Sequence, residues 1–384
     1  MEEIYDVVVI GAGIFGSCAA YHCQKKGLKT LLVEQFALGH INGSSHGRSR
    51  IIRYAHADPH YVPLVHDTYQ QIAHLEKETE ETLWRQTGLL WASKTAKIDS
   101  ISQILSNFNI KHEKIKGEEV ASRYPQFTFD SDWAALIDPM GGILYADKWL
   151  RIFQDRFLKL GGKIREKEEV FCYSEVSEEI IELRTSKGLL HSKKAIFTVG
   201  PWIKEIFPQA PLRIQPESIA VCYWRTIRSE DTPLLECDKF PVFIVSGSSA
   251  LPQGFFGLPS HDYDGCAKIC FHSGEHTDGP NHPDVVSQEF IDRPAEFIRN
   301  HIPIIDFTQP VQVDKCKYTM SEDNHYVVGY YPGSKKVLIG GCGSGSGFKV
   351  APGIGRILAE MAADEKPSID VSFFGFDRFS KKSV

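Results

Sequence analysis

Apolar and polar residues follow two different patterns along the chain, and each pattern predicts a different kind of sheet. Near the N-terminus, a short run from Asp6 to Ile10 is followed by a glycine-rich turn, a helical segment to about Lys26 and a second apolar run that ends at Glu34. Uninterrupted apolar runs are typical of parallel strands that are buried on both faces. This segment therefore predicts a strand–helix–strand unit.

Related patterns occur at two later places in the chain. Residues 335–363 predict a strand, a glycine-rich loop and a helix, and Pro352 stands in the first turn of that helix, where proline is tolerated. Residues 195–207 predict another strand, which runs through a glycine turn into a helix. We therefore expect both ends of the chain to belong to one α/β domain with a Rossmann-like sheet.

The middle of the chain alternates between apolar and polar residues. The alternating segments are AVCYWRTI, PVFIVSG, GFFGLPS and CAKICFHS. Such alternation predicts an antiparallel sheet with one face open to a cavity or to solvent. Because no repeat or low-complexity linker divides the sequence, we predict two interleaved domains. The first is built from residues 1–88, 140–218 and 320–384, and the second from residues 89–139 and 219–319.

Composition narrows the classes of function. With 384 residues, 42% hydrophobic and 24% charged, the chain is a globular one with enough residues for two cores. A net charge of -6 and scattered lysines and arginines give no basic face, which excludes nucleic acid as an expected partner. The first residues, MEEIYD, are acidic, unlike a secretory signal, and no apolar run reaches the roughly 18 residues of a membrane span. We expect an intracellular, soluble protein.

The nine cysteines also point to a reducing compartment, because their number is odd and none form a CxxC pair. No zinc-ligand spacing is present, so the sequence predicts no metal site. Four cysteines in apolar or periodic segments are expected to be small buried residues: Cys18, Cys23, Cys172 and Cys222.

The clearest chemical motif is GAGIFG, in which Gly11, Gly13 and Gly16 follow a predicted strand and open a predicted helix. Gly11 allows a tight turn, Gly13 lets the backbone approach a pyrophosphate, and Gly16 allows the helix to pack closely on the strand. Glu34, at the end of the second strand, is placed to accept hydrogen bonds from a ribose diol and disfavours a ribose phosphate. The pattern predicts a site for FAD or NAD, against the alternative of a glycine turn that binds nothing.

Several further stretches resemble the monomeric sarcosine oxidase family, and most closely its animal branch, the peroxisomal sarcosine and pipecolate oxidases. These are GSSHGRSRIIRYAH, DKCKYT, GSGFKVAPGIG, TVGPW and VCYWR, which occur in the family's order over nearly the whole chain. The resemblance implies a two-domain, D-amino-acid-oxidase-like flavoprotein fold with FAD. It also implies oxidation of a secondary amino acid by O2 with H2O2 as a product.

The resemblance assigns a role to Cys316, in DKCKYT, which matches the cysteine that carries FAD through an 8α-thioether in this family. The flanking Lys315 and Lys317 are expected to favour the thiolate form that attacks the flavin. Taken without the family, a lone cysteine is more often an unreactive buried residue.

Two motifs match the positions that hold the cofactor and the substrate carboxylate. The resemblance implies that Arg53 and Lys349 bind the carboxylate and that Arg50 lies against the flavin, with Arg50 and Lys349 also counted among the cofactor contacts. Gly345 and Gly347 belong to the glycine-rich loop that the resemblance places at the cofactor. The alternative for each charged residue is an ordinary solvent-exposed side chain.

The resemblance also implies catalytic roles for Lys268, His272, Arg50 and Tyr318. Lys268 and His272 fall on one face of a predicted strand, with Ile269 and Phe271 on the other. In the family, the matching lysine promotes the reaction of reduced flavin with O2, and the matching histidine and tyrosine line the substrate site. Phe256 departs from the family, whose members generally have tyrosine there, so substrate preference is not transferable.

The resemblance leaves the substrate open between sarcosine, another N-methyl amino acid and L-pipecolate. Two other classes of function remain as alternatives: a flavin dehydrogenase that uses a protein or quinone acceptor, and a nucleotide-binding module without catalysis. A monomer is expected from the family. The peroxisome and the cytosol both stay open, because the C-terminal KSV is a poor peroxisomal signal.

Overall fold

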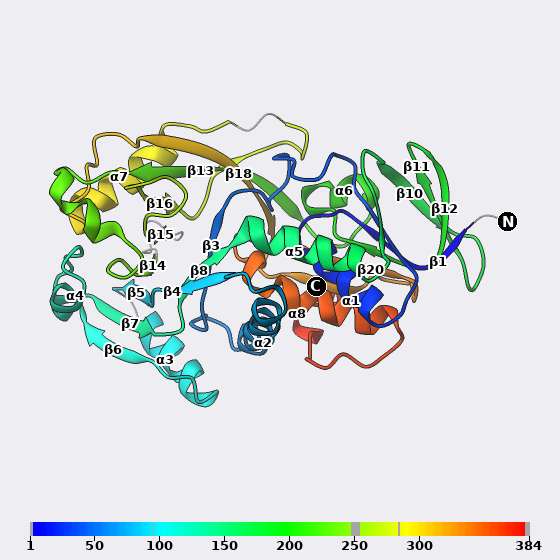
Figure 1. The fold of residues 1–384 in the computed structure, drawn as a ribbon, viewed down its shortest axis with the longest axis horizontal. Coiled ribbons are helices and arrows are strands. Elements are labelled where there is room, and N and C mark those ends of the chain that lie inside the picture. Colours follow the sequence, from blue (N-terminus) through cyan, green and yellow to red (C-terminus); the bar gives the residue numbers. More distant parts are fainter. Residues whose placement is uncertain (1–2, 95, 247–253, 283–284, 381–384) are drawn as a thin grey trace.

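Two large sheets lie at opposite ends of the long axis of the molecule (Figure 1). The structure is a computed structural model that describes residues 3–94, 96–246, 254–282 and 285–380. The C-terminal KSV motif lies outside the described residues. No helix within the described ranges is both long enough and apolar enough to cross a membrane.

The first sheet is mainly parallel where it meets the site. In the described part of the chain it has eight strands, in the order β10-β11-β12-β1-β2-β9, with β20 beside β12 and β19 beside β20. Its strands are β1 (Ile4–Ile10), β2 (Thr30–Val33), β9 (Lys163–Arg165), β10 (Val170–Glu175), β11 (Ile181–Thr185), β12 (Gly188–Phe197), β19 (Val327–Tyr330) and β20 (Val337–Gly341). β1 pairs in parallel with both β2 and β12, and β12 pairs in parallel with β20. The predicted strand–helix–strand unit is therefore confirmed.

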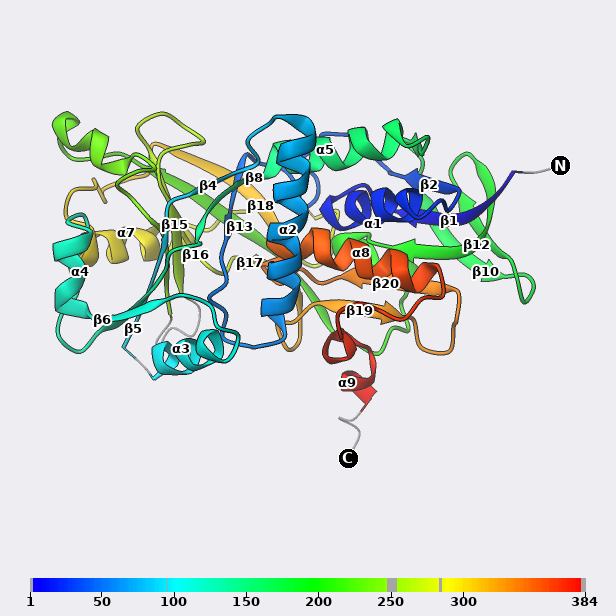
Figure 2. The ribbon, with the colours of Figure 1, turned by 60° about the horizontal axis from the view of Figure 1, so that its bottom comes forward.

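Both faces of this sheet are apolar and buried, and helices cover one of them. Val7 and Val9 pack with the helices, whereas Val8 and Ile10 belong to a second cluster on the opposite face. The covering helices are α1 (Ile14–Lys25), α2 (Tyr61–Thr79), α5 (Ala146–Lys159) and α8 (Ala351–Ala362). Figure 2 shows α1 and α8 side by side.

The contact between α1 and α8 joins the two ends of the chain. A Cβ at Gly355 of α8 would lie 2.5 Å from the Cβ of Cys18 in α1, so glycine is needed for this approach. The prediction that both ends share one sheet and its covering helices is confirmed by this contact and by the β12–β20 pairing. Pro352 stands in the first turn of α8, as predicted.

The second sheet is antiparallel except for one parallel pair, β5 with β14. Among the described residues it has nine strands in the order β17-β13-β16-β15-β14-β5-β7-β6, with β18 beside β13. They are β5 (Leu89–Ser93), β6 (Glu113–Lys116), β7 (Ala134–Asp138), β13 (Ile214–Trp224), β14 (Val242–Val245), β15 (Phe255–Leu258), β16 (Ala267–Phe271), β17 (Glu275–His276) and β18 (Gln312–Ser321). The predicted antiparallel sheet in the middle of the chain is confirmed.

The outer face of the second sheet packs on short helices, and the other face looks into a cavity. The helices on the outer face are α4 (Gly117–Arg123) and α7 (Glu289–His301), whereas α3 (Lys97–Asn107) packs on the other face, against Leu89 and Trp91. A third, small sheet of β3 (Ser49–Ile52), β8 (Gly142–Tyr145) and β4 (Trp84–Gln86) lies between the two large ones. The remaining short helices are α6 (Ile203–Ile206), α9 (Asp377–Ser380) and the 3₁₀ turns η1 (Gly200–Trp202), η2 (Ser229–Leu235), η3 (Gly347–Val350) and η4 (Ser372–Phe374).

The predicted domain ranges stay a prediction. The strands of the first sheet fall within residues 1–88, 140–218 and 320–384, while β13 and β18 of the second sheet extend past the predicted boundaries at 218 and 319. These two long strands pair over ten positions and reach toward the first sheet (Figure 1). They carry side chains from the second sheet to the site.

Candidate active site

One large cavity, of about 850 Å³, lies where the carboxyl ends of the parallel strands meet the open face of the second sheet. Ligands of open α/β sheets bind at this edge. Every predicted site residue except Gly16 lines the cavity. No group of three or more His, Cys, Asp or Glu side chains in the described ranges is arranged to hold a metal ion.

The glycine turn after β1 has the geometry of a dinucleotide cradle. Gly11 has φ +95°, and a Cβ there would lie 2.7 Å from the carbonyl oxygen of Thr198. A Cβ at Gly16 would lie 1.8 Å from the carbonyl oxygen of Gly11, which explains why this glycine packs the helix against the turn and does not face the cavity. Gly13 lies on the cavity wall, so the residues present fit a bound dinucleotide.

Glu34 follows β2 and ties this turn to the next strand. Its Oε2 accepts a hydrogen bond of 2.8 Å from the backbone N–H of Ala12, and its Oε1 accepts one of 3.0 Å from Phe36. The carboxylate also lines the cavity. Its oxygens can therefore accept further hydrogen bonds from a ribose diol, which is the role predicted for it.

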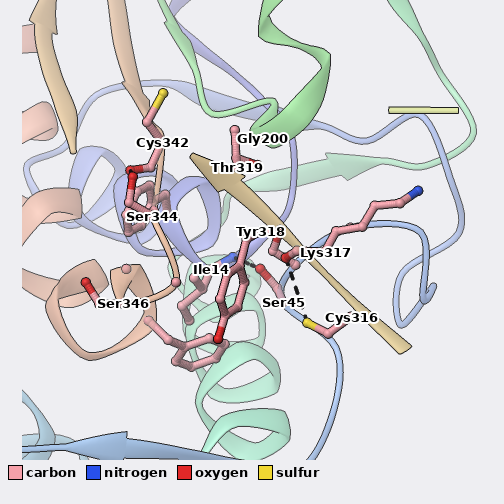
Figure 3. A pocket seen from close by; sticks show the side chains of 18 of the residues that line it. Ile14, Ser45, Gly200, Cys316, Lys317, Tyr318, Thr319, Cys342, Ser344 and Ser346 are labelled. Carbon is pink, nitrogen blue, oxygen red and sulfur yellow. Dashed lines mark hydrogen bonds between the residues drawn. The ribbon is translucent and has the colours of Figure 1, made fainter. Parts of the chain in front are cut away.

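Cys316 lies in the middle of β18, opposite Ile219 of β13, with 7% of its surface exposed and its side chain at the cavity (Figure 3). The prediction that the flanking lysines activate it is wrong, because successive side chains in a strand point to opposite faces. The ammonium of Lys317 donates to the carbonyl of Pro280 at 2.7 Å. The cation beside the thiol is Arg50, whose Nη2 lies 3.8 Å from Sγ.

Arg50 is held by the loop that precedes it. Nη2 donates to the carbonyls of His46 at 2.6 Å and Ser44 at 3.3 Å, and Nη1 donates to the carbonyl of Ser49 at 2.9 Å. The guanidinium also lies 5.7 Å from the ring of Phe348. These contacts fix one positive charge at the cavity wall next to Cys316.

Arg53 and Lys349 form a second cationic group, and both side chains are buried. Arg53 Nη1 donates to the carbonyl of Ala55, its guanidinium lies 4.9 Å from the ring of Trp91, and its Nε has no partner among the described residues. Lys349 Nζ donates to the carbonyl of Ser346 at 2.9 Å. Burial lowers the pKa of Arg53 to about 10, and burial together with Arg53 lowers the pKa of Lys349 well below its usual value. Two buried cations at one cavity wall are the features of a carboxylate site.

His272 and Tyr318 stand beside these cations. The Tyr318 hydroxyl and His272 Nδ1 are 3.4 Å apart, and the two rings pack against Gly345, where a Cβ would lie 2.5 Å from His272 and 2.7 Å from Tyr318. Burial, and then Lys349 and Arg53, lower the pKa of His272 to about 4, so the imidazole is neutral at pH 7. A neutral imidazole can accept a hydrogen bond from a substrate amine.

Lys268 and His272 both line the cavity, and Ile269 packs in the opposite core, so the predicted division of the strand faces is confirmed for these residues. The residues next to Lys268 in the sequence are apolar, but a charged side chain lies beside it in space. Its ammonium forms an ion pair with Asp262, which lies in the loop between β15 and β16. The partner was missed because nothing in the local pattern distinguishes Asp262 from an exposed loop acid.

His56 is a second residue that the sequence did not single out. Its ring lines the cavity with 4% of its surface exposed and stacks on Tyr61 at 5.0 Å, and its Nε2 has no partner in the described part of the chain. Burial, and then Arg53 and Lys349, lower its pKa well below the usual value. The sequence signal that could have pointed to His56 is its position three residues after Arg53. Of the four cysteines expected to be buried, Cys172 is exposed and that prediction is wrong.

Comparison with known proteins shows that the chain is similar to FAD-dependent oxidoreductases. Residues 6–361 match the model of a family described as FAD dependent oxidoreductase. The chain is 52% identical over 386 residues to a putative sarcosine oxidase of Caenorhabditis elegans, with 100% of both chains covered. It is 34% identical over 387 residues to the peroxisomal sarcosine oxidase of Homo sapiens, covering 98% of this chain and 97% of that one. The crystal structure of L-proline dehydrogenase from P. horikoshii has the same fold, with a TM-score of 0.83 at 19% identity over 99% of both chains.

Proposed function

Because the chain belongs to the FAD-dependent oxidoreductases, and within them to the sarcosine oxidases, we propose that it oxidises sarcosine or another N-methyl amino acid with O2. From sarcosine the products are glycine, formaldehyde and H2O2. When bound, FAD accepts two electrons from the carbon next to the amine and passes them to O2. The observation that carries the proposal is the buried pair of Arg53 and Lys349 at the wall of a cavity that also holds the dinucleotide cradle.

Substrate binding starts with the carboxylate. Its charge compensates the two buried cations, and the guanidinium of Arg53 has an unpartnered Nε to offer. Each hydrogen bond between charged groups contributes about 1.5–3 kcal/mol, so this contact orients the amine-bearing carbon as well as binding it. Lys349 adds a second donor from the loop after β20.

The amine must be neutral when its carbon is oxidised, and the residues beside the cations favour that form. His272 is uncharged at pH 7, and its ring and the Tyr318 hydroxyl give the amine polar contacts without adding a negative charge. The nearby Arg53 and Lys349 disfavour a second positive charge on the substrate. Lys268, farther along the same face of β16, supplies the fixed cation that assists electron transfer to O2.

Cys316 is the residue that we propose carries FAD covalently. Support comes from its place at the cavity, from its burial and from the guanidinium of Arg50, whose Nη2 lies 3.8 Å from the sulfur. Ser44 and Thr319 also line the cavity, and each has a buried hydroxyl oxygen without a partner in the described ranges. These oxygens are available to hydrogen-bond the cofactor.

The experiment that tests the proposal has two parts. The purified yellow protein is reduced with sarcosine without oxygen, and the flavin absorbance must bleach; on adding air, one H2O2 must form per formaldehyde. The protein is then acid-denatured, and the colour must stay with wild type and with Cys172→Ser, whose thiol is exposed, but be released from Cys316→Ser. A low peroxide yield with normal bleaching would instead support a dehydrogenase with another acceptor.

A second substrate, L-pipecolate, is favoured by one observation. The ring of Phe256 lines the cavity 5.9 Å from that of His272 and presents an apolar wall to the substituent on nitrogen. We therefore propose to compare kcat/KM for sarcosine and L-pipecolate in wild type and in Phe256→Tyr. A shift toward sarcosine in the variant assigns this wall to specificity, and an unchanged ratio removes the case for L-pipecolate.

The assembly state and the cellular site complete the proposal. We propose a monomer, supported by the monomeric sarcosine oxidase family that the sequence resembles, and test it by light scattering. We place the enzyme in the peroxisome or the cytosol, and its similarity to the peroxisomal sarcosine oxidase of Homo sapiens favours the peroxisome. Fractionation of cells that express the untagged chain decides between the two.

A further inference from the structure

Lys268 is buried, and its surroundings differ from those of a free cation. The side chain is 6% exposed, and its ammonium forms an ion pair with Asp262. It also donates to Ser49 Oγ at 2.6 Å and to the Ser49 carbonyl at 3.3 Å, and lies 5.5 Å from the ring of Tyr223. A buried ammonium is stable only when a counterion and hydrogen bonds replace water.

Asp262 is built to serve as that counterion. Its side chain is 4% exposed, and its Oδ2 accepts hydrogen bonds of 2.9 Å from both Ser49 Oγ and the Tyr223 hydroxyl. Burial raises the pKa of Asp262, but Lys268 and the hydrogen bonds outweigh burial, so the net pKa lies below the usual value. The carboxylate is therefore ionised at neutral pH, and two hydroxyl donors fix the oxygen that pairs with Lys268.

The same cluster reaches the proposed flavin tether. The Ser49 carbonyl accepts from Lys268 Nζ and from Arg50 Nη1, and Arg50 Nη2 in turn lies 3.8 Å from the sulfur of Cys316. Lys268 and Arg50 thus share one acceptor at the cavity wall. A shift of the ammonium would change the cationic surroundings of the cofactor.

In the described part of the chain, Asp262 is the acid that forms an ion pair with Lys268. The remaining titratable or charged groups around this cluster are Tyr223, Tyr263, His261, Cys270, Asp314, Arg48 and Arg50. The Asp314 carboxylate accepts a hydrogen bond of 3.1 Å from the exposed Tyr263 hydroxyl. Burial, with smaller contributions from their neighbours, raises the pKa of Tyr223, lowers that of His261 and raises that of Cys270 to about 12. These three are uncharged at pH 7, and the two arginines are positive. Without Asp262, Lys268 would be a buried cation that has lost its ion-pair partner.

We propose that Asp262 is a positioning residue for the oxygen half of the reaction: its carboxylate keeps the Lys268 ammonium charged and fixed at the cavity wall. This inference rests on the proposed function, which gives Lys268 its role toward O2. It is distinct from substrate binding, because Asp262 contacts neither Arg53 nor Lys349 and does not line the cavity.

The test measures the two half-reactions separately in the holoenzyme. The flavin is reduced with dithionite, so the result does not depend on which amine is the substrate, and its reoxidation by O2 is followed between pH 6.5 and 9. Anaerobic reduction by sarcosine is measured in parallel. The variants are Asp262→Asn, Asp262→Glu and Lys268→Met, and Asp264→Asn, which removes an exposed acid from the same loop, is the control.

The expected result is a pH-dependent loss. In Asp262→Asn, reoxidation at pH 9 falls at least tenfold below wild type and recovers to within threefold at pH 6.5, because without its counterion the buried ammonium gives up its proton more readily as pH rises. Reduction by sarcosine stays within threefold at both pH values. The visible spectrum of the oxidised variant changes over the same pH range, whereas the spectra of wild type and Asp264→Asn do not. Asp262→Glu restores most of the rate at pH 9.

Three outcomes overturn the inference. If Asp262→Asn reoxidises like wild type while Lys268→Met is slow, only the role of Asp262 fails. If Lys268→Met is as fast as wild type, the proposed role of Lys268 fails, and the inference fails with it. If Asp262→Asn slows both half-reactions equally at every pH, the residue is structural. Should that variant not fold, Tyr223→Phe, which removes one hydrogen bond from Oδ2, must give a smaller change in the same direction.

Discussion

Gly345 offers a prediction whose size follows from the structure. This glycine has φ +70°, and a Cβ built on it would lie 2.5 Å from His272 Cε1 and 2.7 Å from Tyr318 Cε2. Gly345→Ala therefore introduces two costs: an unfavourable backbone conformation and an overlap with two site rings. Gly333, in the turn between β19 and β20, has φ +83° but no atom within 4 Å of its Cβ position. Gly333→Ala introduces the first cost alone.

The two costs have different sizes. The left-handed conformation costs a non-glycine residue about 1–2 kcal/mol. Overpacking of a filled site adds about 1–3 kcal/mol. The gain from a stiffer unfolded chain is about 0.4–1 kcal/mol and is the same for both variants, so it cancels in the comparison. Gly345→Ala should thus be about 1–3 kcal/mol less stable than Gly333→Ala.

The assay is thermal unfolding of the two holoproteins at one pH, with KM for the amine measured on the same samples. An unfolding entropy of about 2.1 cal/mol/K per residue gives about 0.8 kcal/mol/K for the whole chain, so the expected gap in Tm is about 1–4 °C. KM should rise in Gly345→Ala alone, because its methyl group displaces His272 and Tyr318. Equal Tm and equal KM in the two variants would refute the argument that this glycine is required by the rings.

Three further predictions concern the cofactor cradle, the carboxylate site and a buried histidine. Gly16→Ala should yield protein without flavin, because its Cβ would lie 1.8 Å from the Gly11 carbonyl oxygen. Gly279→Ala, whose Cβ would have no atom within 4 Å, should keep a full flavin content as measured by absorbance. Normal flavin content in Gly16→Ala would contradict the assignment of this turn as the cofactor cradle. Arg53→Lys keeps the positive charge but loses the guanidinium fork. A loss of about 3 kcal/mol in substrate binding corresponds to a kcat/KM about 100-fold lower, and the flavin content should be unchanged. A fall in kcat/KM of less than fivefold would show that the substrate carboxylate binds elsewhere. The pKa of His272 is about 4 when folded, against about 6.5 in an unfolded chain, so the unfolded state binds more protons and stability must fall as pH drops from 7 to 5, by about 2 kcal/mol for this residue. His272→Gln should show a smaller drop in Tm between pH 7 and pH 5 than wild type, and equal drops would show that the folded protein protonates this ring.

Local patterns predicted the elements well, because the strands and helices near the cofactor cradle are determined by short-range sequence. The first unit was expected at Asp6–Ile10 with a helix to about Lys26, and β1 and α1 cover Ile4–Ile10 and Ile14–Lys25. The small differences lie at the element ends, where patterns are least informative. The matching of strand faces around Lys268 also followed from the two-residue period alone.

The contacts that give the site its electrostatics were not predictable in this way. Lys268 meets Ser49, which is 219 residues away in the chain, and the loop acid beside it carries no local signal. The error at Cys316 is different, because the two-residue period already shows that Lys315 and Lys317 point away from it. Adjacency in sequence was mistaken for adjacency in space, and the charge that reaches the thiol comes from Arg50 on another strand.

The β12–β20 pairing and the contact of α1 with α8 have a consequence for how the protein is made. A ribosome releases the glycine turn well before β20 and the loop that follows it. A nascent chain therefore has no complete flavin cradle until β20 has left the ribosome, so FAD is loaded only after that point. In a flavin-starved cell, newly made chains would accumulate as apoprotein in which α1 and β1 are already formed but FAD is not bound.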